Sequence, residues 1–176
     1  MPGSILPMDE SSRETGFAGD APPKQGGTPP LRIGTVRNDA ELAEALEILH
    51  QLRADVPLTE LPRRIEAMRI LNDYRLLVGV LAGVEDGGRV VAVAGIRPDD
   101  GLSRGPHLRV DDLVVCESHR DRGFGRAMLR GVADEARRLG LPKVLLDARH
   151  SARGFYERLG FAFREAEPCM IDVDAL

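Results

Sequence analysis

Two glycines that separate a strand pattern from a helix pattern constrain this chain more than any other feature. The apolar segment 113–115 includes two β-branched valines and favours a strand. After Gly125, apolar residues recur at helical spacing over positions 128–139. Glycines just before a helix let backbone N–H groups approach an anion, and the first N–H groups of a helix have no partner within it. The pattern Arg120-x-x-Gly123-x-Gly125 therefore predicts a phosphate site at the start of a helix.

This glycine pattern differs from the two common nucleotide loops. The loop does not read Gly-x-x-x-x-Gly-Lys-Ser/Thr, and no third glycine completes Gly-x-Gly-x-x-Gly. A dinucleotide loop also follows the first strand of its fold and is trailed by a ribose-binding acid. The loop at 120–125 instead follows a fourth strand pattern, so the sequence argues against a dinucleotide-binding fold.

The chain of 176 residues divides into a tail and one domain. Residues 1–30 hold half of the 12 prolines and only isolated apolar residues, so they cannot bury enough surface to offset the entropy of ordering. We predict a flexible Pro/Gly-rich tail over 1–30 and a single folded domain over 31–176. No apolar run reaches the roughly 18 residues of a membrane helix, and no secretory pattern opens the chain. A cytoplasmic protein without a membrane partner is therefore expected.

Charge and metal-ligand content narrow the classes of partner. The net charge is −4, which argues against a nucleic-acid partner because nucleic-acid-binding domains usually carry a basic footprint. The two cysteines, Cys116 and Cys169, lie far apart in sequence and predict neither a metal site nor a disulfide framework. No partners that suggest metal ligation accompany His50, His107 or His119, so no metal is expected.

The first part of the domain predicts a strand and two helices. A strand is expected over 31–36 because apolar and polar residues alternate there. Asn38 and Glu41 form a capping-box-like pair before the first helix. Thr59 is the expected cap of a second helix, whose inward positions include Leu71.

An antiparallel meander should follow these helices. Apolar runs at 76–84 and 89–96 flank a Gly-rich turn, which is a strong hairpin signal. A further turn is expected at 98–101, and a strand over 108–115 then leads into the glycine loop.

The end of the chain predicts a helix, a parallel strand, a short helix and closing strands. The long helix after the loop should end at Gly140, and a buried strand over 143–147 should return parallel to the strand before the loop. Ser151 is the expected cap of a short helix, and residues 161–173 predict one or two closing strands. The fold class is α/β, a mixed sheet with helices on both faces, in the order β-α-α-β-β-β-α-β-α-β-β.

A second motif lies one helix and one strand beyond the glycine loop. It reads Phe155-Tyr156-Glu157-Arg158-Leu159-Gly160-Phe161. This segment is similar to the Phe/Leu-Tyr-x-Lys/Arg-Leu-Gly-Phe motif of the Gcn5-related N-acetyltransferase (GNAT) family, and the loop at 120–125 resembles the Arg/Gln-x-x-Gly-x-Gly/Ala pyrophosphate loop of that family. The two motifs stand in the family's order, and the element order resembles the family over 31–176.

The resemblance implies a GNAT-like fold and an N-acetyltransferase that uses acetyl-CoA as its co-substrate. In that family two parallel strands part, and the pantetheine arm pairs with the backbone of one of them. The glycine loop holds the pyrophosphate. Many relatives carry Asn seven residues before the motif tyrosine, where this chain has Arg149. The positions that the resemblance assigns to acetyl-CoA are Leu113, Val114, Val115, Arg120, Asp121, Arg122, Gly123, Phe124, Gly125, Arg126 and Arg149.

The resemblance also suggests catalytic residues. Tyr156 matches the family tyrosine that protonates the departing thiolate. The general base stays open between Asp111 and Asp112, which stand beside Arg109 near the place of the glutamate that many members use. Successive strand residues face opposite ways, so only one of these two acids should point at the site. His150 is a further candidate for relaying protons.

The acceptor remains undetermined by the sequence. An amine of a small molecule or of a protein is expected, and polyamines, amino-acid derivatives and aminoglycoside-like drugs all fit this description. The alternative of another class is a catalytically idle acyl-CoA-binding or regulatory module with the same fold. Because many relatives dimerise, a homodimer is a further expectation.

Overall fold

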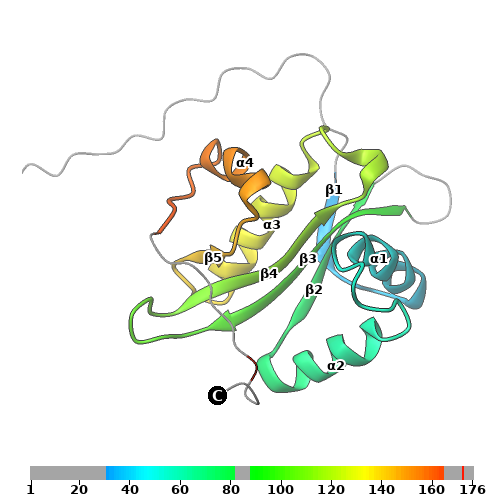
Figure 1. Ribbon diagram of the computed structural model, residues 1–176, viewed down its shortest axis with the longest axis horizontal. Helices are drawn as coiled ribbons and strands as arrows, with labels where there is room; N and C mark the ends of the chain where they lie inside the picture. Colours follow the sequence, from blue (N-terminus) through cyan, green and yellow to red (C-terminus); the bar gives the residue numbers. More distant parts are fainter. Residues whose placement is uncertain (1–30, 82–87, 165–171, 173–176) are drawn as a thin grey trace, which may run out of the picture.

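The computed structural model describes residues 31–81, 88–164 and 172, which form a mixed sheet with helices on both faces (Figure 1). The strand bounds are Leu31–Thr35 for β1, Arg75–Leu81 for β2, Arg89–Asp99 for β3, His107–Val115 for β4 and Val144–Leu146 for β5. The sheet order is β1-β2-β3-β4-β5. Neighbours are antiparallel from β1 to β4, and β5 runs parallel to β4. The expected meander and the parallel return are thus confirmed.

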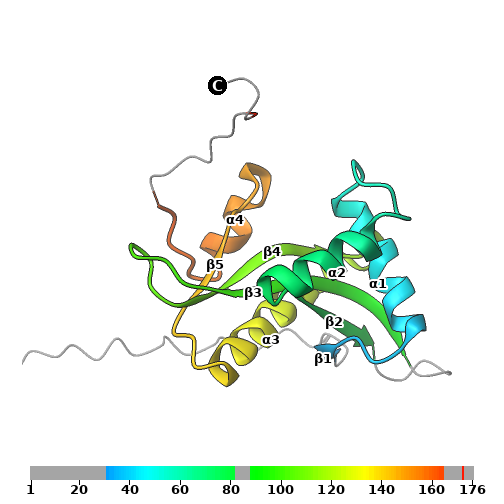
Figure 2. The same cartoon turned by 90° about the horizontal axis from the view of Figure 1, so that it is seen from below.

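Helices cover both faces of this sheet. The bounds of the α-helices are Asp39–Leu52 for α1, Leu61–Asn72 for α2, Phe124–Arg138 for α3 and Arg153–Glu157 for α4, with 3₁₀ turns at Glu117–His119 and His150–Ala152. The α1 and α2 helices lie on one side of the sheet and α3 on the other (Figure 2). Within the described part of the chain, no helix is long and apolar enough to cross a membrane.

The order of elements agrees with the expected one as far as α4. Residues 161–164 form no strand, and the rest of the expected closing strands falls largely on 165–171 and 173–176, which lie outside the described residues. Residues 1–30 lie outside them as well, so the division of the chain at residue 30 stays a prediction.

Two apolar clusters join the layers, one on each face of the sheet. Ile48 of α1 belongs to the same cluster as Val93 of β3. Met128 of α3 belongs to the opposite cluster, together with Ala94, the next residue of β3. Successive residues of β3 therefore bury their side chains on opposite faces, as strand geometry requires. Full burial of a large apolar side chain contributes about 1.5–3 kcal/mol.

Only half of the capping box at α1 forms. Asn38 caps the helix as expected, since its Oδ1 accepts a hydrogen bond of 2.8 Å from the N–H of Glu41. The Glu41 carboxylate does not return to Asn38. It accepts instead from the N–H of Arg37 at 2.9 Å and forms an ion pair with Arg32.

Thr59 and Ser151 do not cap the helices for which the sequence suggests them. The residue before α2 is Glu60, and the residue before α4 is Ala152. Both have helical backbone angles, whereas a capping side chain needs an extended backbone at its own position. Ser151 lies within the 3₁₀ turn that precedes α4.

Three boundary details also bear on the predictions. Gly140 follows α3 with φ 70°, so the expected end of that helix is confirmed. Pro98 and Asp99 belong to β3 rather than to the expected turn. They lie beyond Ile96, the last residue of β3 paired in the β2 ladder, where one edge of β3 is open and tolerates proline.

Leu71 is 78% exposed rather than inward, because only the start of α2 is fully buried.

Candidate active site

The first feature of the site is an open edge on β4. β5 pairs with β4 only at Leu108, Arg109 and Val110. Beyond these residues, over 111–115, no strand of the described chain pairs with this edge. An extended ligand that carries amide groups can complete such an edge by pairing with its backbone. This is the segment that the resemblance assigns to the pantetheine arm.

The side chains of this segment are occupied by the core. Leu113 and Val115 pack against the cluster on the α3 face, and Val114 is buried on the α1 face. The segment can therefore offer a ligand its backbone rather than its side chains, in keeping with the predicted ladder contact.

A β-bulge lies where the edge opens. Gly95 of β3 stands opposite Asp112, while the next residue, Ile96, stands opposite Val110. Asp111 is therefore an extra residue on β4. A bulge bends its strand and increases the local twist, so it accounts for the short pairing between β4 and β5.

The bulge brings the carboxylates of Asp111 and Asp112 to the same face of the sheet. Asp112 bonds to Tyr74, which belongs to the cluster beneath α1. Asp111 bonds to Arg97 and Arg109, which alternate with residues of the α3-side cluster and so face away from α3. The expectation that the two acids face opposite ways was wrong, because the extra residue resets the alternation.

The chain leaves β4 through a loop that presents backbone N–H groups at the start of α3. Gly123 precedes the helix with φ 81°, in the left-handed region that favours glycine. Among the described residues no side chain caps α3, and its first turn holds no acid. Its first intrahelical bond runs from the N–H of Ala127 to the carbonyl of Gly123 at 3.1 Å. The N–H groups before Ala127 thus have no acceptor within the helix and suit an anion.

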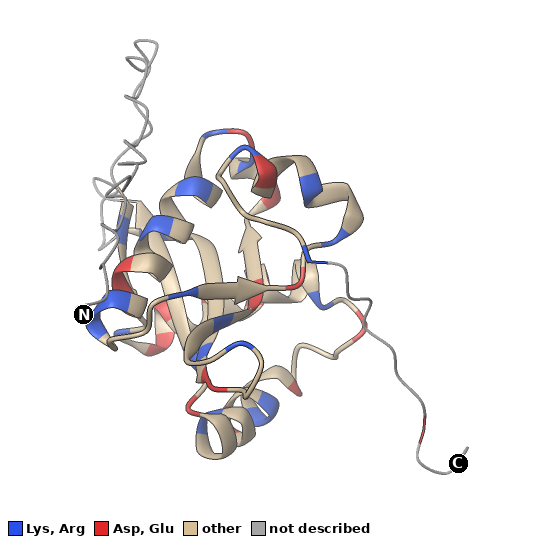
Figure 3. Ribbon diagram, turned by 90° about the vertical axis from the view of Figure 1, so that its left-hand side faces the viewer, with Lys and Arg blue, Asp and Glu red and all other residues tan. Residues whose placement is uncertain are grey.

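Three arginines lie in or beside this loop. Arg120, Arg122 and Arg126 are exposed there. Burial lowers the pKa of His119, and the charges of Arg122 and Arg89 lower it further. The part of this lowering that Arg122 and Arg89 cause reflects positive charge near the loop. Elsewhere along the described ribbon, basic and acidic positions are interspersed (Figure 3).

The other predicted loop residues contribute mainly backbone. Phe124 is only 1% exposed, so its side chain belongs to the core and only its N–H can serve a ligand. Asp121 is exposed and has φ 61°, which makes it one of the turning points of the loop.

The glycine loop and the second motif are in contact. A Cβ atom on Gly125 would lie 3.2 Å from Cζ of Phe155, which belongs to α4. Glycine at this position therefore lets the Phe155 ring lie against the start of α3. The two motifs, which are separated in sequence, form one continuous region.

Tyr156 lies in this region as a buried phenol. It is 8% exposed, and its ring meets Phe155 and Phe161 edge-on at centroid distances of 5.0 and 5.4 Å. Its hydroxyl has no hydrogen-bond partner among the described residues. Burial raises the pKa of Tyr156, so the phenol stays protonated at neutral pH and can act as a proton donor.

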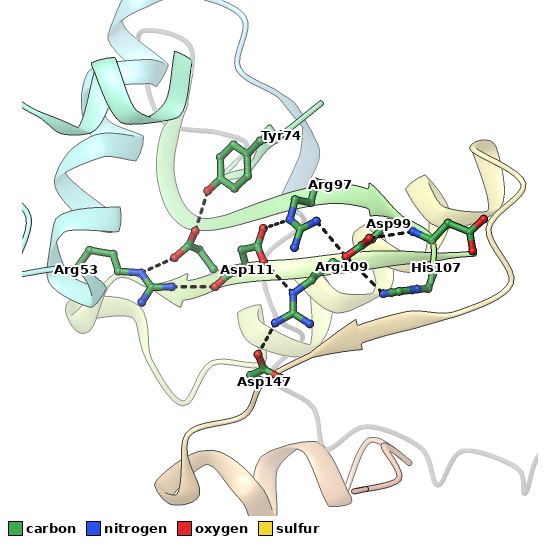
Figure 4. A network of polar contacts seen from close by, with 10 residues as sticks. Arg53, Tyr74, Arg97, Asp99, His107, Arg109, Asp111 and Asp147 are labelled. Carbon is green, nitrogen blue, oxygen red and sulfur yellow. Dashed lines mark hydrogen bonds and ion pairs between the residues drawn. The ribbon is translucent and has the colours of Figure 1, made fainter. Parts of the chain in front are cut away.

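A second set of polar residues surrounds the bulge on the face opposite α3 (Figure 4). Asp112 is buried, and its two carboxylate oxygens accept from the Nε of Arg53 at 2.7 Å and from the hydroxyl of Tyr74 at 2.8 Å. A Cβ atom on Gly95 would lie 1.8 Å from the Tyr74 hydroxyl oxygen, so glycine is needed for Tyr74 to reach Asp112. Burial and the Asp112 charge raise the pKa of Tyr74, which keeps it a donor.

Asp111 is held by two arginines. Its Oδ2 accepts from Nε of Arg97 at 2.8 Å, and its Oδ1 accepts from Nε of Arg109 at 3.1 Å. Arg97 also pairs with Asp99 at 3.0 Å, and Arg109 pairs with Asp147 just beyond β5. These ion pairs link β3 and β4 to the segment that follows β5 (Figure 4).

Arg149 faces the first helix. Its guanidinium donates a hydrogen bond of 3.1 Å to the carbonyl of Leu52, the last residue of α1. It therefore links the segment after β5 to α1. Its assigned contact with the cofactor, and a proton relay through the exposed His150, stay predictions.

Four residues of the site were missed by sequence reasoning, namely Arg53, Tyr74, Gly95 and Arg97. Arg53 reads as a solvated residue at a helix end, and Tyr74 reads as the entry to a strand. Their roles depend on partners far away along the chain, such as Asp112, which is 59 residues from Arg53. Gly95 was the only local signal, because a glycine inside a strand pattern suggests a bulge or a close approach.

Comparisons with known proteins agree with this geometry. A model of the acetyltransferase (GNAT) family matches residues 43–161. A glucosamine 6-phosphate N-acetyltransferase of Trypanosoma brucei brucei is 30% identical over 137 residues, which cover 75% of this chain and 90% of that protein. The crystal structure of a Trypanosoma brucei acetyltransferase has a TM-score of 0.64 and 27% identity, over 81% of this chain and 99% of that one.

A predicted acetyltransferase of Clostridium acetobutylicum, solved with acetyl-CoA, shares the fold with a TM-score of 0.62 at 17% identity, over 84% of this chain and 99% of that one. The family match includes the glycine loop, the bulge and the second motif. The chain therefore belongs to the GNAT family of acetyltransferases.

Proposed function

We propose that this acetyltransferase moves the acetyl group of acetyl-CoA directly to a primary amine of a small molecule. The observation that carries the proposal is the open edge of β4 beside the uncapped start of α3. The open edge of β4 can pair with an amide-bearing arm, and the start of α3 can hold a pyrophosphate. The two parts are contiguous in the chain and stand in the order that a ligand with both groups needs.

The residues present fit acetyl-CoA. The backbone of 113–115 would hold the pantetheine arm, and the N–H groups around Gly123 would hold the pyrophosphate. Arg120, Arg122 and Arg126 add the positive charge that an anion requires. When bound, acetyl-CoA supplies an activated thioester.

The chain supplies the proton transfers. Tyr156 keeps a proton on its hydroxyl oxygen and can give it to the departing sulfur. The attacking amine must lose a proton, and Asp111 is the better placed of the two acids to accept it through water. Its side chain is 18% exposed against 9% for Asp112. Each oxygen of Asp111 accepts one bond from an arginine and keeps a lone pair for water.

An amino sugar phosphate is the first acceptor to test. The Trypanosoma brucei relative bears the name of a glucosamine 6-phosphate N-acetyltransferase. A panel with glucosamine 6-phosphate, glucosamine, ornithine and a polyamine separates the need for a phosphate from the need for an amine alone. Release of free thiol from acetyl-CoA measures turnover of each acceptor.

Binding and turnover test the proposal separately. Acetyl-CoA at 100 times its Kd should stabilise the protein by about 2.7 kcal/mol, which a melting curve detects. The absence of any shift at millimolar acetyl-CoA would exclude the cofactor assignment. A clear shift without thiol release for any amine would favour the idle acyl-CoA-binding module instead.

A further inference from the structure

Arg53 binds two consecutive residues of the bulge at once. Its Nε donates to the carboxylate of Asp112 at 2.7 Å, and its Nη2 donates to the backbone carbonyl of Asp111 at 3.0 Å. The first bond is an ion pair and the second fixes a main-chain group. Arg53 follows α1 directly, so the end of that helix is joined to β4 where β4 parts from β5.

The second bond restricts the peptide plane between Asp111 and Asp112. The described residues contain no cis peptide bond, so the Asp112 N–H points opposite to the carbonyl that Arg53 holds. A bulge leaves its extra residue unpaired, and the plane on either side of Asp111 is less constrained by the ladder than elsewhere in β4. The guanidinium of Arg53 supplies a constraint that β3 does not.

The first bond anchors the guanidinium itself. Asp112 is held from its other oxygen by Tyr74, and Tyr74 is fixed in the space that Gly95 leaves open. Tyr74 is 2% exposed, whereas the side chain of Arg53 is 44% exposed. Tyr74 therefore fixes Asp112 from inside the core, and the more exposed side chain of Arg53 reaches the bulge.

The chemistry of arginine suits this task. A planar guanidinium offers several donors in a fixed fork, so it can hold a carboxylate and a carbonyl in a defined relation to each other. A lysine has a single charged nitrogen on a flexible stem, which can neutralise Asp112 without fixing the carbonyl.

We propose that Arg53 is a positioning residue for acetyl transfer, which sets the orientation of the bulge peptide beside the reacting groups. The inference rests on the proposed function, because the open edge next to the bulge is where that function places the pantetheine arm of acetyl-CoA. Arg53 touches neither co-substrate. It acts through Asp111 and Asp112.

The test compares the Arg53→Lys and Arg53→Ala variants with the wild type. We expect kcat to fall by about 10²-fold in each, because a small misplacement of the reacting groups costs that much. The KM for acetyl-CoA and the shift in Tm that it causes should stay unchanged, because Gly123 and its loop are untouched. Millimolar guanidinium chloride should restore part of the kcat of Arg53→Ala, and sodium chloride should not.

Arg69→Ala is the matched control. Arg69 on α2 holds Glu66 with the same pair of nitrogens, at 2.8 and 2.7 Å, but lies on the surface. This variant should keep the kcat of the wild type. Amide exchange at Asp112 gives a readout that needs no acceptor, and Arg53→Ala should lose protection there.

The possible outcomes distinguish the positioning role of Arg53 from the proposed function. An Arg53→Ala variant with wild-type kcat and unchanged exchange at Asp112 would overturn the positioning role. A loss of kcat that guanidinium does not restore, and that follows the fall in Tm, would also overturn it, because instability alone would explain it. A wild type that neither binds acetyl-CoA nor releases thiol refutes the proposed function instead, and exchange at Asp112 still decides whether Arg53 orders the bulge.

Discussion

The two halves of the site are built from different kinds of atoms. On the side where we propose that the cofactor binds, β4 beyond the bulge and the loop before α3 offer backbone groups, and Gly123 lets the chain present them. On the other side of the bulge, which we call the proposed acceptor side, Arg53, Tyr74 and Arg97 offer side chains that meet at the bulge (Figure 4). The proposed cofactor side is mostly one contiguous stretch of chain, whereas the proposed acceptor side is assembled from β3, β4 and the residues next to α1 and β2.

This difference predicts how each half responds to change. A backbone site tolerates most side-chain substitutions but fails where glycine is required for φ or close approach. A side-chain network is sensitive at each of its members, because removal of one leaves a buried partner unsatisfied. Four experiments test this difference between the two halves, in order of decreasing expected effect.

Gly123→Val should abolish binding of acetyl-CoA. A β-branched side chain at φ 81° is strained and stands where an anion would approach the N–H groups. The shift in Tm with acetyl-CoA, which corresponds to about 2.7 kcal/mol at 100 times Kd for the wild type, should vanish. Gly140→Val places the same strain at the other end of α3, where a Cβ meets no atom within 4 Å, and should keep the shift. Equal shifts in both variants would show that the loop does not hold the pyrophosphate.

Tyr156→Phe should lower kcat by roughly 10²-fold or more, the usual contribution of a general acid, while acetyl-CoA still shifts the Tm. Because burial raises the pKa of Tyr156, ionisation of this group should not reduce the activity of the wild type below a pH of about 10. Steady-state rates across this pH range test both statements. A variant with unchanged kcat would remove Tyr156 as the proton donor.

Gly95→Ala should disturb the proposed acceptor side alone. The new Cβ would lie 1.8 Å from the Tyr74 hydroxyl oxygen, and overpacking of this kind costs about 1–3 kcal/mol. We expect a lower Tm and a lower kcat with an unchanged response to acetyl-CoA. Gly34→Ala in β1, where the nearest atom is a terminal nitrogen of Arg32 at 3.7 Å, is the control and should have little effect. If Gly95→Ala instead weakened acetyl-CoA binding, the two halves would not be independent.

The pKa of His119 should rise when acetyl-CoA binds. Burial and the charges of Arg122 and Arg89 hold it below the usual histidine value in the free protein. A pyrophosphate nearby favours the protonated ring, so binding takes up protons and tightens as the pH falls through this range. Titration of the His119 ring signals by NMR measures the change. Pantetheine, which lacks the diphosphate, should leave the pKa of His119 unchanged. If pantetheine also shifted this pKa, the diphosphate would not be the cause of the shift.

The fold could be predicted from the sequence as far as α4. Hairpin, loop and helix signals are local, and Gly140 marks the end of α3 through its own backbone requirement. The predicted caps at Thr59 and Ser151 were wrong because the residue type alone does not decide whether a residue caps a helix. A capping residue is recognised by its type, but it caps only where the backbone before the helix is extended, and at α2 and α4 it is helical.

The local sequence alone predicts the glycine loop of the proposed cofactor side, because a glycine and a helix start are properties of neighbouring residues. It did not determine the proposed acceptor side. The bulge at Asp111 shifts the alternation of β4 by one residue, and no pattern within β4 shows this, because a bulge is defined by its pairing with β3. Only the tertiary structure brings Arg53 and Tyr74 to Asp112, since the contacts that hold a buried charge come from segments far apart along the chain.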